Sequence, residues 1–371
     1  MSAVLRADRP SSGSGRSGGA APIAGRTAVR IGPVSTVWRP RIVLITAVGL
    51  VLVVLAAALN LGRGDFPISV SDVLRTLVGA GSAAQEFIVL ELRLPRTLTG
   101  LLVGAALALS GAITQTIARN PLASPDILGV TAGASATAVA VIVFGGVGTG
   151  ALGAYVGLPA AALVGGLATA ALVYALAYRQ GIEGYRLVLV GVGIGAVASA
   201  VTSWLLIRAE IWEAAKATVW LTGSLNGRGW EHVLPVGLAL AVLVPTALVL
   251  GYGLSVLQLG DDVARGLGLR VDLARGALIV VAVVLAAVAT ASAGPILFVA
   301  LVVPQIAQRL VGAARPPLLT SAIFGALLTS AADLIARMAL GAELPVGIIT
   351  AILGAPYLLY LLAARNRKVT G

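Results

Sequence analysis

The sequence predicts an all-α, polytopic membrane protein with about ten transmembrane helices, and three observations support this fold class. Hydrophobic residues make up 58 % of the 371 residues and charged residues only 11 %, whereas a soluble domain carries about 25 % charged residues. Apolar runs long enough to cross about 30 Å of hydrocarbon recur along the chain. The chain has no cysteine and a single histidine, His232, which excludes disulfides, thiolate chemistry and Cys/His metal sites. We therefore expect no cofactor in this chain.

The two ends of the chain are polar. Residues 1–40 are rich in Ser, Gly and Arg, and they have too few large apolar groups to order themselves, so we expect a disordered tail. The first apolar run begins at Ile42 and is too long for the apolar core of a signal peptide, so no cleavable signal is expected. The transmembrane domain is predicted over residues 41–365, and residues 366–371 form a second tail.

Apolar runs divide this domain into ten predicted spans. The uncharged run 276–308 is too long for one helix, and Gly294-Pro295 interrupts it, so we expect a tight hairpin of two spans with a kink at Pro304. Residues 68–74 are expected to form a short capped helix at the surface. The predicted spans cover residues 42–61, 97–118, 127–147, 153–178, 187–207, 233–256, 276–293, 295–309, 318–340 and 345–363.

The arginines predict the orientation. With the N-terminus in the cytoplasm, 18 of the 26 basic residues lie on the cytoplasmic side, 7 lie outside, and Arg337 lies within a span. This distribution follows the positive-inside rule, and it places both termini in the cytoplasm. It also accounts for the net charge of +11 through membrane topology, so a nucleic-acid-binding role is not indicated.

Residues 257–275 form an extended polar segment between apolar runs. Asp261 and Asp262 are placed to open a short helix, because carboxylates favour the positive end of the helix dipole. Gly266 or Gly268 is expected to close it in a left-handed conformation. Apolar residues at 259, 263 and 267 lie on one face. The pattern fits either a solvated connecting loop or a docking element, and on the predicted topology it is cytoplasmic.

Small residues recur at four-residue spacing in several spans. Gly100 and Gly104, Gly129 and Gly133, and Gly191 and Gly195 each place two glycines on one helix face, which permits close approach of a neighbouring helix. With 46 glycines in the chain, the pattern also arises by chance. It predicts a tightly packed bundle rather than particular contacts.

Three passages carry a resemblance to a known family. The first runs from Ile88 to Gly133 and contains "LRLPRTLTGLLVG" and "ARNPLASPDILGV"; the second is "LGDDVARGLGL" at 259–269. The third joins "GPILFVALVVPQIAQRL" to "ADLIARMALGAELPVGIITAILGAPYLLYLL". Together they resemble the FecCD-type permeases, the membrane subunits of ATP-binding-cassette (ABC) importers for ferric siderophores, haem and cobalamin. The resemblance covers roughly residues 40–365.

The resemblance implies the type II ABC importer permease fold and a set of partners. It implies a dimer with an identical or homologous permease, two cytoplasmic ATPase subunits that bind ATP and Mg, and an extracytoplasmic binding lipoprotein or periplasmic protein. The chain has no Walker A motif, so ATP hydrolysis is expected in the partner. By similarity, 257–275 is a coupling loop that seats on the ATPase, through Leu259, Gly260, Asp261, Asp262, Ala264, Arg265, Leu267 and Gly268.

On the outer face, relatives use arginines to pair with glutamates of the binding protein. Arg93, Arg96 and Arg337 match those positions. For Arg93 and Arg96 the alternative is anchoring at the membrane interface. Arg337 lies four residues after Asp333, so the alternative there is an intrahelical ion pair within the span.

Three further positions qualify the resemblance. Many relatives carry histidine where this chain has Gln305, so no proton-linked or substrate-binding role is assigned to it. His232 is expected to be an interface residue rather than a ligand, and Asn120-Pro121-Leu122 a structural turn. The expected function is inward transport of ferric siderophores across the cytoplasmic membrane, with cobalamin or haem import as the alternative. An ion-coupled secondary transporter is a more remote alternative. Such transporters normally need carboxylates inside the membrane, and Asp333 is the only acidic residue within a predicted span.

Overall fold

A computed structural model of the protein describes residues 27–31, 34–38, 40–64, 66–145, 151–178, 184–338 and 343–366. It comprises two compact units, residues 1–43 and 44–371. In the first, β1 (Thr27–Ile31) and β2 (Val34–Trp38) form an antiparallel pair in which Thr27 faces Trp38. This hairpin lies within the tail for which composition predicts disorder; residues 1–26 of that tail lie outside the described part.

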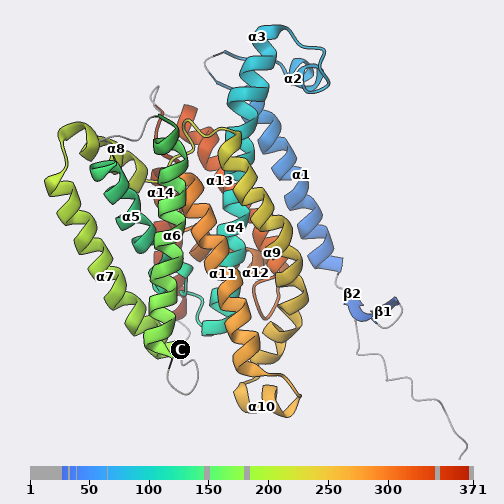
Figure 1. The fold of residues 1–371 in the computed structure, drawn as a ribbon. Coiled ribbons are helices and arrows are strands. Elements are labelled where there is room, and N and C mark those ends of the chain that lie inside the picture. Colours follow the sequence, from blue (N-terminus) through green and yellow to red (C-terminus); the bar gives the residue numbers. More distant parts are fainter. Residues whose placement is uncertain are drawn as a thin grey trace, which may run out of the picture. The chain divides into compact units, whose positions relative to one another are not determined.

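The second unit is a helical bundle, which confirms the all-α prediction (Figure 1). Within the described residues, ten apolar helices correspond in order to the ten predicted spans. They are α1 (Pro40–Gly62), α4 (Leu94–Ala118), α5 (Val130–Phe144), α6 (Ala151–Ala177), α7 (Gly184–Arg208), α9 (Trp230–Leu257), α11 (Val271–Ala293), α12 (Val299–Val311), α13 (Leu318–Met338) and α14 (Val346–Asn366). In the described part of the chain, seven are long and apolar enough to cross a membrane, and α5, α12 and α14 are shorter apolar helices.

Shorter elements connect the spans. α2 (Val70–Leu77) begins after Ser69, whose hydroxyl accepts a hydrogen bond from the Asp72 backbone N–H at 3.2 Å, which confirms the predicted capped helix. The remaining elements are α3 (Ala83–Glu86), the π-helical turn η1 (Phe87–Arg93), the 3-10 turn η2 (Pro125–Leu128), α8 (Ile211–Leu221) and α10 (Asp261–Gly266).

Helix α4 runs through the middle of the bundle (Figure 1) and packs against α13, α11, α9 and α12. Glycine permits these approaches. A Cβ on Gly104 would lie 2.3 Å from the backbone oxygen of Gly325 in α13, and one on Gly111 would lie 1.8 Å from that of Ala300 in α12. Such distances are shorter than any real Cβ contact, so backbones meet at these positions.

The predicted glycine pairs differ in what they contact. Gly104 meets α13, Gly133 meets α6 at Gly165, and Gly191 approaches the backbone of Ile127, whereas nothing lies within 4 Å of a Cβ on Gly195. A four-residue glycine spacing therefore does not by itself mark a contact.

The run 276–308 is split as predicted, but the expected tight hairpin is wrong. α11 ends at Ala293, with Gly294 at φ +75°, and α12 begins only at Val299. α12 packs against α4, α13 and α14 instead of folding back along α11. The intervening residues redirect the chain, because Phe298 adopts a left-handed φ of 67° and packs closely on Gly354 of α14.

Candidate functional site

The polar segment 257–275 contains the predicted short helix. α10 begins at Asp261, with Asp261 and Asp262 in its first turn, and ends at Gly266. Gly268 has a φ of +83° and Gly260 a φ of +106°, so glycines in conformations that other residues rarely adopt flank the helix on both sides. The prediction of closure at Gly268 is confirmed, while Gly266 is the last helical residue.

One side of this segment is apolar and uncovered. Leu259, Val263 and Leu267 are 61 %, 50 % and 64 % exposed, while the adjacent Ala264 is fully buried. Figure 1 places α10 at the end of the bundle, beyond the apolar helices. An apolar face that the chain's own core does not cover is typical of an interaction surface.

The carboxylate of Asp261 turns inward and binds two arginines. Arg275 Nη2 donates to Oδ1 at 2.8 Å and to Oδ2 at 3.0 Å, and Arg119 Nη2 donates to Oδ1 at 3.0 Å. Arg119 also donates to the Leu257 backbone oxygen at 2.7 Å. The arrangement, here called the Asp261 clamp, joins α10 to the end of α4 and the start of α11.

Electrostatics favour the ionised clamp. Burial opposes ionisation of Asp261, but hydrogen bonding to Arg275 and the charges of Arg275, Arg119 and Arg265 outweigh it and hold the Asp261 pKa below its usual value. The adjacent Asp262 has a fully exposed side chain and lies 4.0 Å from Arg265. Of the two predicted helix-opening carboxylates, only Asp261 therefore has an internal role.

At the opposite end of the bundle, Arg93 is 9 % exposed. Its Nη1 donates to the Leu61 backbone oxygen at 2.8 Å and its Nη2 to that of Phe66 at 2.6 Å. These bonds tie the start of α4 to the end of α1. The predicted outer-face arginine thus has a structural role in the isolated chain.

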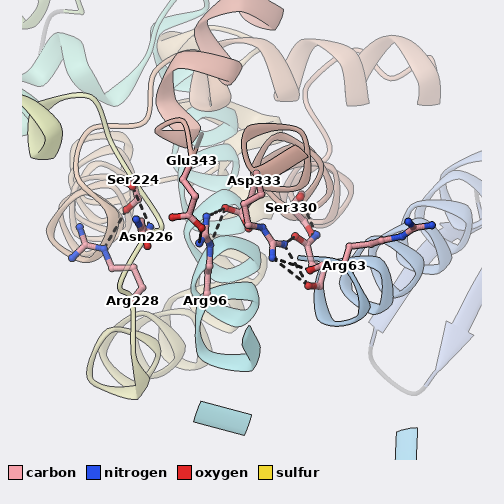
Figure 2. Close-up of polar contacts among 10 residues, drawn as sticks. Arg63, Arg96, Ser224, Asn226, Arg228, Ser330, Asp333 and Glu343 are labelled. Carbon is pink, nitrogen blue, oxygen red and sulfur yellow. Dashed lines mark hydrogen bonds and ion pairs between the residues drawn. The ribbon is translucent and has the colours of Figure 1, made fainter. Parts of the chain in front are cut away.

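Arg96 and Arg337 share one buried carboxylate, that of Asp333. Figure 2 shows Arg96 beside Asp333 and Glu343. Arg96 Nη2 donates to Asp333 Oδ1 at 2.9 Å, and Arg337 Nε lies 3.3 Å from Asp333 Oδ2. Arg96 Nη1 also binds the half-exposed Glu343 at 3.1 Å, and Arg337 donates to the Asn60 side chain. The intrahelical pair between Asp333 and Arg337 is confirmed, whereas Arg96 was not expected to join it.

Arg228 lies near this network, in the loop before α9 (Figure 2). It donates to the Ser224 backbone oxygen at 3.2 Å, and Nη1 lies 3.0 Å from Nε2 of His232. Burial lowers the pKa of Arg228 to about 10, against the opposing charge of Glu231. His232 is buried, with Nδ1 3.1 Å from Glu231, so it packs inside this chain instead of facing outward.

One cleft of about 1020 Å³ lies at this end of the bundle. It is lined by four arginines, Arg93, Arg96, Arg228 and Arg337, and by the glutamates at 91, 231 and 343.

Near the α10 end, Gln305 Nε2 donates to Gln115 Oε1 at 2.7 Å. Gln115 in turn donates to the Leu301 backbone oxygen at 2.8 Å. The neutral Gln305 therefore joins α12 to α4. The side-chain oxygen of Asn120 accepts a hydrogen bond from the Leu122 backbone N–H at 3.0 Å, as expected of a turn.

Across the described ranges, no three His, Asp or Glu side chains gather in a way that could hold a metal ion.

A model of the FecCD transport family matches residues 39–364. The chain belongs to the FecCD transport family. The match covers all ten apolar helices apart from the last two residues of α14, so the bundle as a whole is the family domain.

Curated relatives of this FecCD chain are permease proteins. It is 41 % identical over 335 residues to the ferric enterobactin transport system permease protein FepG of Escherichia coli, covering 90 % of this chain and 99 % of the relative. It is 39 % identical to a siderophore transport system permease protein of Bacillus subtilis, with 90 % and 98 % covered. It is 42 % identical to the cobalamin import system permease protein BtuC of Halobacterium salinarum, with 76 % and 75 % covered.

A solved structure agrees with this assignment. An inward-facing ABC transporter described as of the metal-chelate type superposes with a TM-score of 0.77 at 31 % sequence identity, covering 86 % of this chain and 99 % of that one. The FecCD chain therefore has the type II ABC importer permease fold.

Proposed function

We propose that this protein is the permease subunit of an ABC importer that moves ferric siderophores inward across the cytoplasmic membrane. A separate subunit hydrolyses ATP in this proposal. The observation that carries it is the exposed apolar face of α10 at one end of a FecCD bundle, because a transport subunit without a Walker A motif needs a surface on which an ATPase can act.

The α10 end is the proposed ATPase contact. Leu259, Val263 and Leu267 would enter an apolar groove of the ATPase, and Asp262 and Arg265 would lie at its polar rim. ATP-driven closure of two ATPase subunits would then displace α10 and tilt packed helices between inward-facing and outward-facing states. The proposal places this end, both termini and the tails 1–40 and 366–371 in the cytoplasm.

Co-purification tests the ATPase contact. Leu267→Asp or Gly268→Asp should abolish co-purification with the ATPase while leaving membrane insertion intact, because a carboxylate in an apolar groove is desolvated without a partner. Leu74→Asp makes the same change on exposed α2 at the opposite end and should retain the ATPase. Undiminished co-purification of the α10 variants would refute the contact.

The arginine end is the proposed docking site for an extracytoplasmic binding protein, with a second permease, identical or homologous, completing the dimer. All three arginines are bonded internally, so replacing them together with alanine would test folding and docking at once. Arg96→Gln changes one of them and should lower the on-rate of the binding protein and flatten its salt dependence. Thermal unfolding of the same variant, measured beside the kinetics, separates a docking defect from a folding defect. Arg75→Gln, on exposed α2, is the control. Wild-type kinetics for Arg96→Gln would refute docking through this residue.

Ferric siderophore is the proposed cargo because relatives that this chain covers almost fully are named for enterobactin or siderophore transport. Cobalamin is the second candidate, supported by the BtuC relative. A deletion strain complemented with this gene should regain uptake of radiolabelled iron from a catecholate or hydroxamate chelate, and Leu267→Asp should not restore it. Normal iron uptake with a cobalamin defect would favour the second candidate.

Ion-coupled transport has less support. Such a transporter normally needs carboxylates near the bilayer midplane that can change their charge. Asp333 is bound by Arg96 and Arg337, so its carboxylate is already engaged in ion pairs within this chain.

A further inference from the structure

We infer that Asp261 is a positioning residue that transmits displacement of α10 to α4 and α11. The inference rests on the proposed function, in which an ATPase acts on the exposed face of α10. It separates two roles within one short helix: the outward apolar residues receive the partner, and the inward carboxylate connects the helix to the bundle.

The first argument is the geometry of the clamp. Asp261 binds Arg275, 14 residues later on α11, and Arg119, 142 residues earlier at the end of α4. The Arg275 side chain is 11 % exposed and that of Asp261 is 36 % exposed, so a largely buried guanidinium anchors a carboxylate that is partly open to water. A single carboxylate therefore joins three elements that sequence separates widely.

The second argument concerns the two ends of α10, a helix of six residues whose one buried side chain is Ala264. Glycines with positive φ, Gly260 and Gly268, flank the helix, and such positions are conformationally permissive joints. The backbone of α10 packs against α9 and α11. Arg119 lines two cavities, of about 830 and 680 Å³, and Asp261 and Arg275 line the second with it, so the clamp lies at the edge of a cavity.

The third argument is that α4 runs from the clamp to the opposite end of the bundle. Arg119 caps α4 with a left-handed φ of 50°, which is uncommon for a residue with a side chain. Arg96 lies 23 positions earlier in the chain, about 35 Å along the helix axis at 1.5 Å per residue. Arg96 binds Asp333 and Glu343 at the far end. One packed helix thus connects the clamp with the opposite network.

Reconstituted transporter tests the inference. In proteoliposomes with ATPase and binding protein, Asp261→Asn should retain the ATPase but lower uptake per ATP hydrolysed on the order of tenfold, a typical size for coupling between sites. Adding Arg119→Gln to Asp261→Asn should cause little further loss of uptake per ATP, because both changes break the same link between α10 and α4. Asp272→Asn, an exposed carboxylate on the same segment, should behave as wild type.

A positional measurement separates coupling from damage to the fold. The chain has no cysteine, so spin labels at Asp262→Cys on α10 and Leu319→Cys on α13 report one distance in the permease alone. Asp261→Asn should broaden the distance distribution, and Asp272→Asn should leave it narrow. The expected result is a broadened distribution together with reduced uptake per ATP.

The outcomes distinguish the two hypotheses. Unchanged uptake per ATP or an unchanged distance distribution in Asp261→Asn would overturn the positioning role alone. Loss of the ATPase from Asp261→Asn would also overturn it, since Asp261 would then be a contact residue. Retention of the ATPase by Leu267→Asp would instead overturn the proposed function.

Discussion

At the α10 end of the bundle, three apolar side chains face outward and Asp261 is bound inward; at the opposite end, Arg96, Asp333 and Arg337 are buried in one network. The first end leaves apolar surface uncovered, and it is joined to the bundle by the ion pairs of Asp261, by the buried Ala264 and by packing of α10 against α9 and α11. The second has a buried ion network that side chains of α4, α13 and α1 share, and its exposed apolar side chains, such as Leu74, lie on α2. The comparison indicates an end built to be moved and an end built to hold its shape.

Removing the shared carboxylate should have the largest effect. Asp333→Ala leaves two buried guanidinium groups without their common partner, and breaking a buried ion pair costs about 3–5 kcal/mol. We expect the free energy of unfolding in detergent, measured by denaturant titration, to fall by this amount. Asp262→Ala, at a fully exposed carboxylate of the other end, should change it by less than about 0.5 kcal/mol. Equal effects at both ends would remove the contrast.

Both ends depend on the packing of α4, so the next test disturbs its middle. Gly104→Ala places a methyl group 2.3 Å from the Gly325 backbone oxygen, and overpacking of this kind costs about 1–3 kcal/mol. Gly195→Ala meets nothing within 4 Å, and alanine favours a helix over glycine by about 1 kcal/mol. Thermal unfolding should therefore show a lowered midpoint for the first variant and an equal or raised one for the second. Matching shifts would contradict the packing argument.

The Asp261 clamp should give a smaller, pH-dependent effect. The folded pKa of Asp261 lies below its usual value, so the clamp's contribution to stability is fully present above the unfolded pKa of about 3.9 and is lost as pH falls through the folded pKa. Wild type should therefore be more stable than Asp261→Asn near neutral pH, and the two unfolding midpoints should converge below about pH 4. A constant difference across this range would show that ionisation of Asp261 is not involved.

The smallest effect is expected on the apolar face of α10. Leu267→Ser should change the free energy of unfolding by less than about 0.5 kcal/mol, because an exposed side chain loses little on replacement. Leu254→Ala, at a fully buried position of α9, should cost about 2–5 kcal/mol. Denaturant titration of the isolated permease compares them. A large loss for Leu267→Ser would mean that this residue supports the chain's own fold.

Much of the fold could be predicted because apolar length and local spacing act over short distances. The ten apolar helices, the helix that Asp261 opens and the left-handed Gly268 all follow from neighbouring residues. The Asp333–Arg337 pair also follows, since residues four apart share a helix face. The expected hairpin after α11 failed because the direction of α12 depends on Phe298 meeting Gly354, 56 positions later.

Each candidate site was only half predictable. The resemblance named Arg96 and Arg337, but not that they share Asp333 or that Asn60, inside a charge-free span, binds Arg337. An asparagine in an apolar run was a signal that could have pointed to this partner, because buried amides require hydrogen bonds. For Asp261, no sequence feature indicated Arg119 or Arg275 as its partners.

The sequence by itself determined the class of this protein, its ten apolar helices, its family and the short polar helix between α9 and α11. Those properties depend on composition, on helical periodicity and on contiguous motifs, all of which are local. Only the tertiary structure decided which charges meet, that Asp261 turns inward while Asp262 does not, and which glycines let backbones touch. The physical reason is that these interactions join residues from separate helices, and their geometry exists only once α4 has packed against its neighbours.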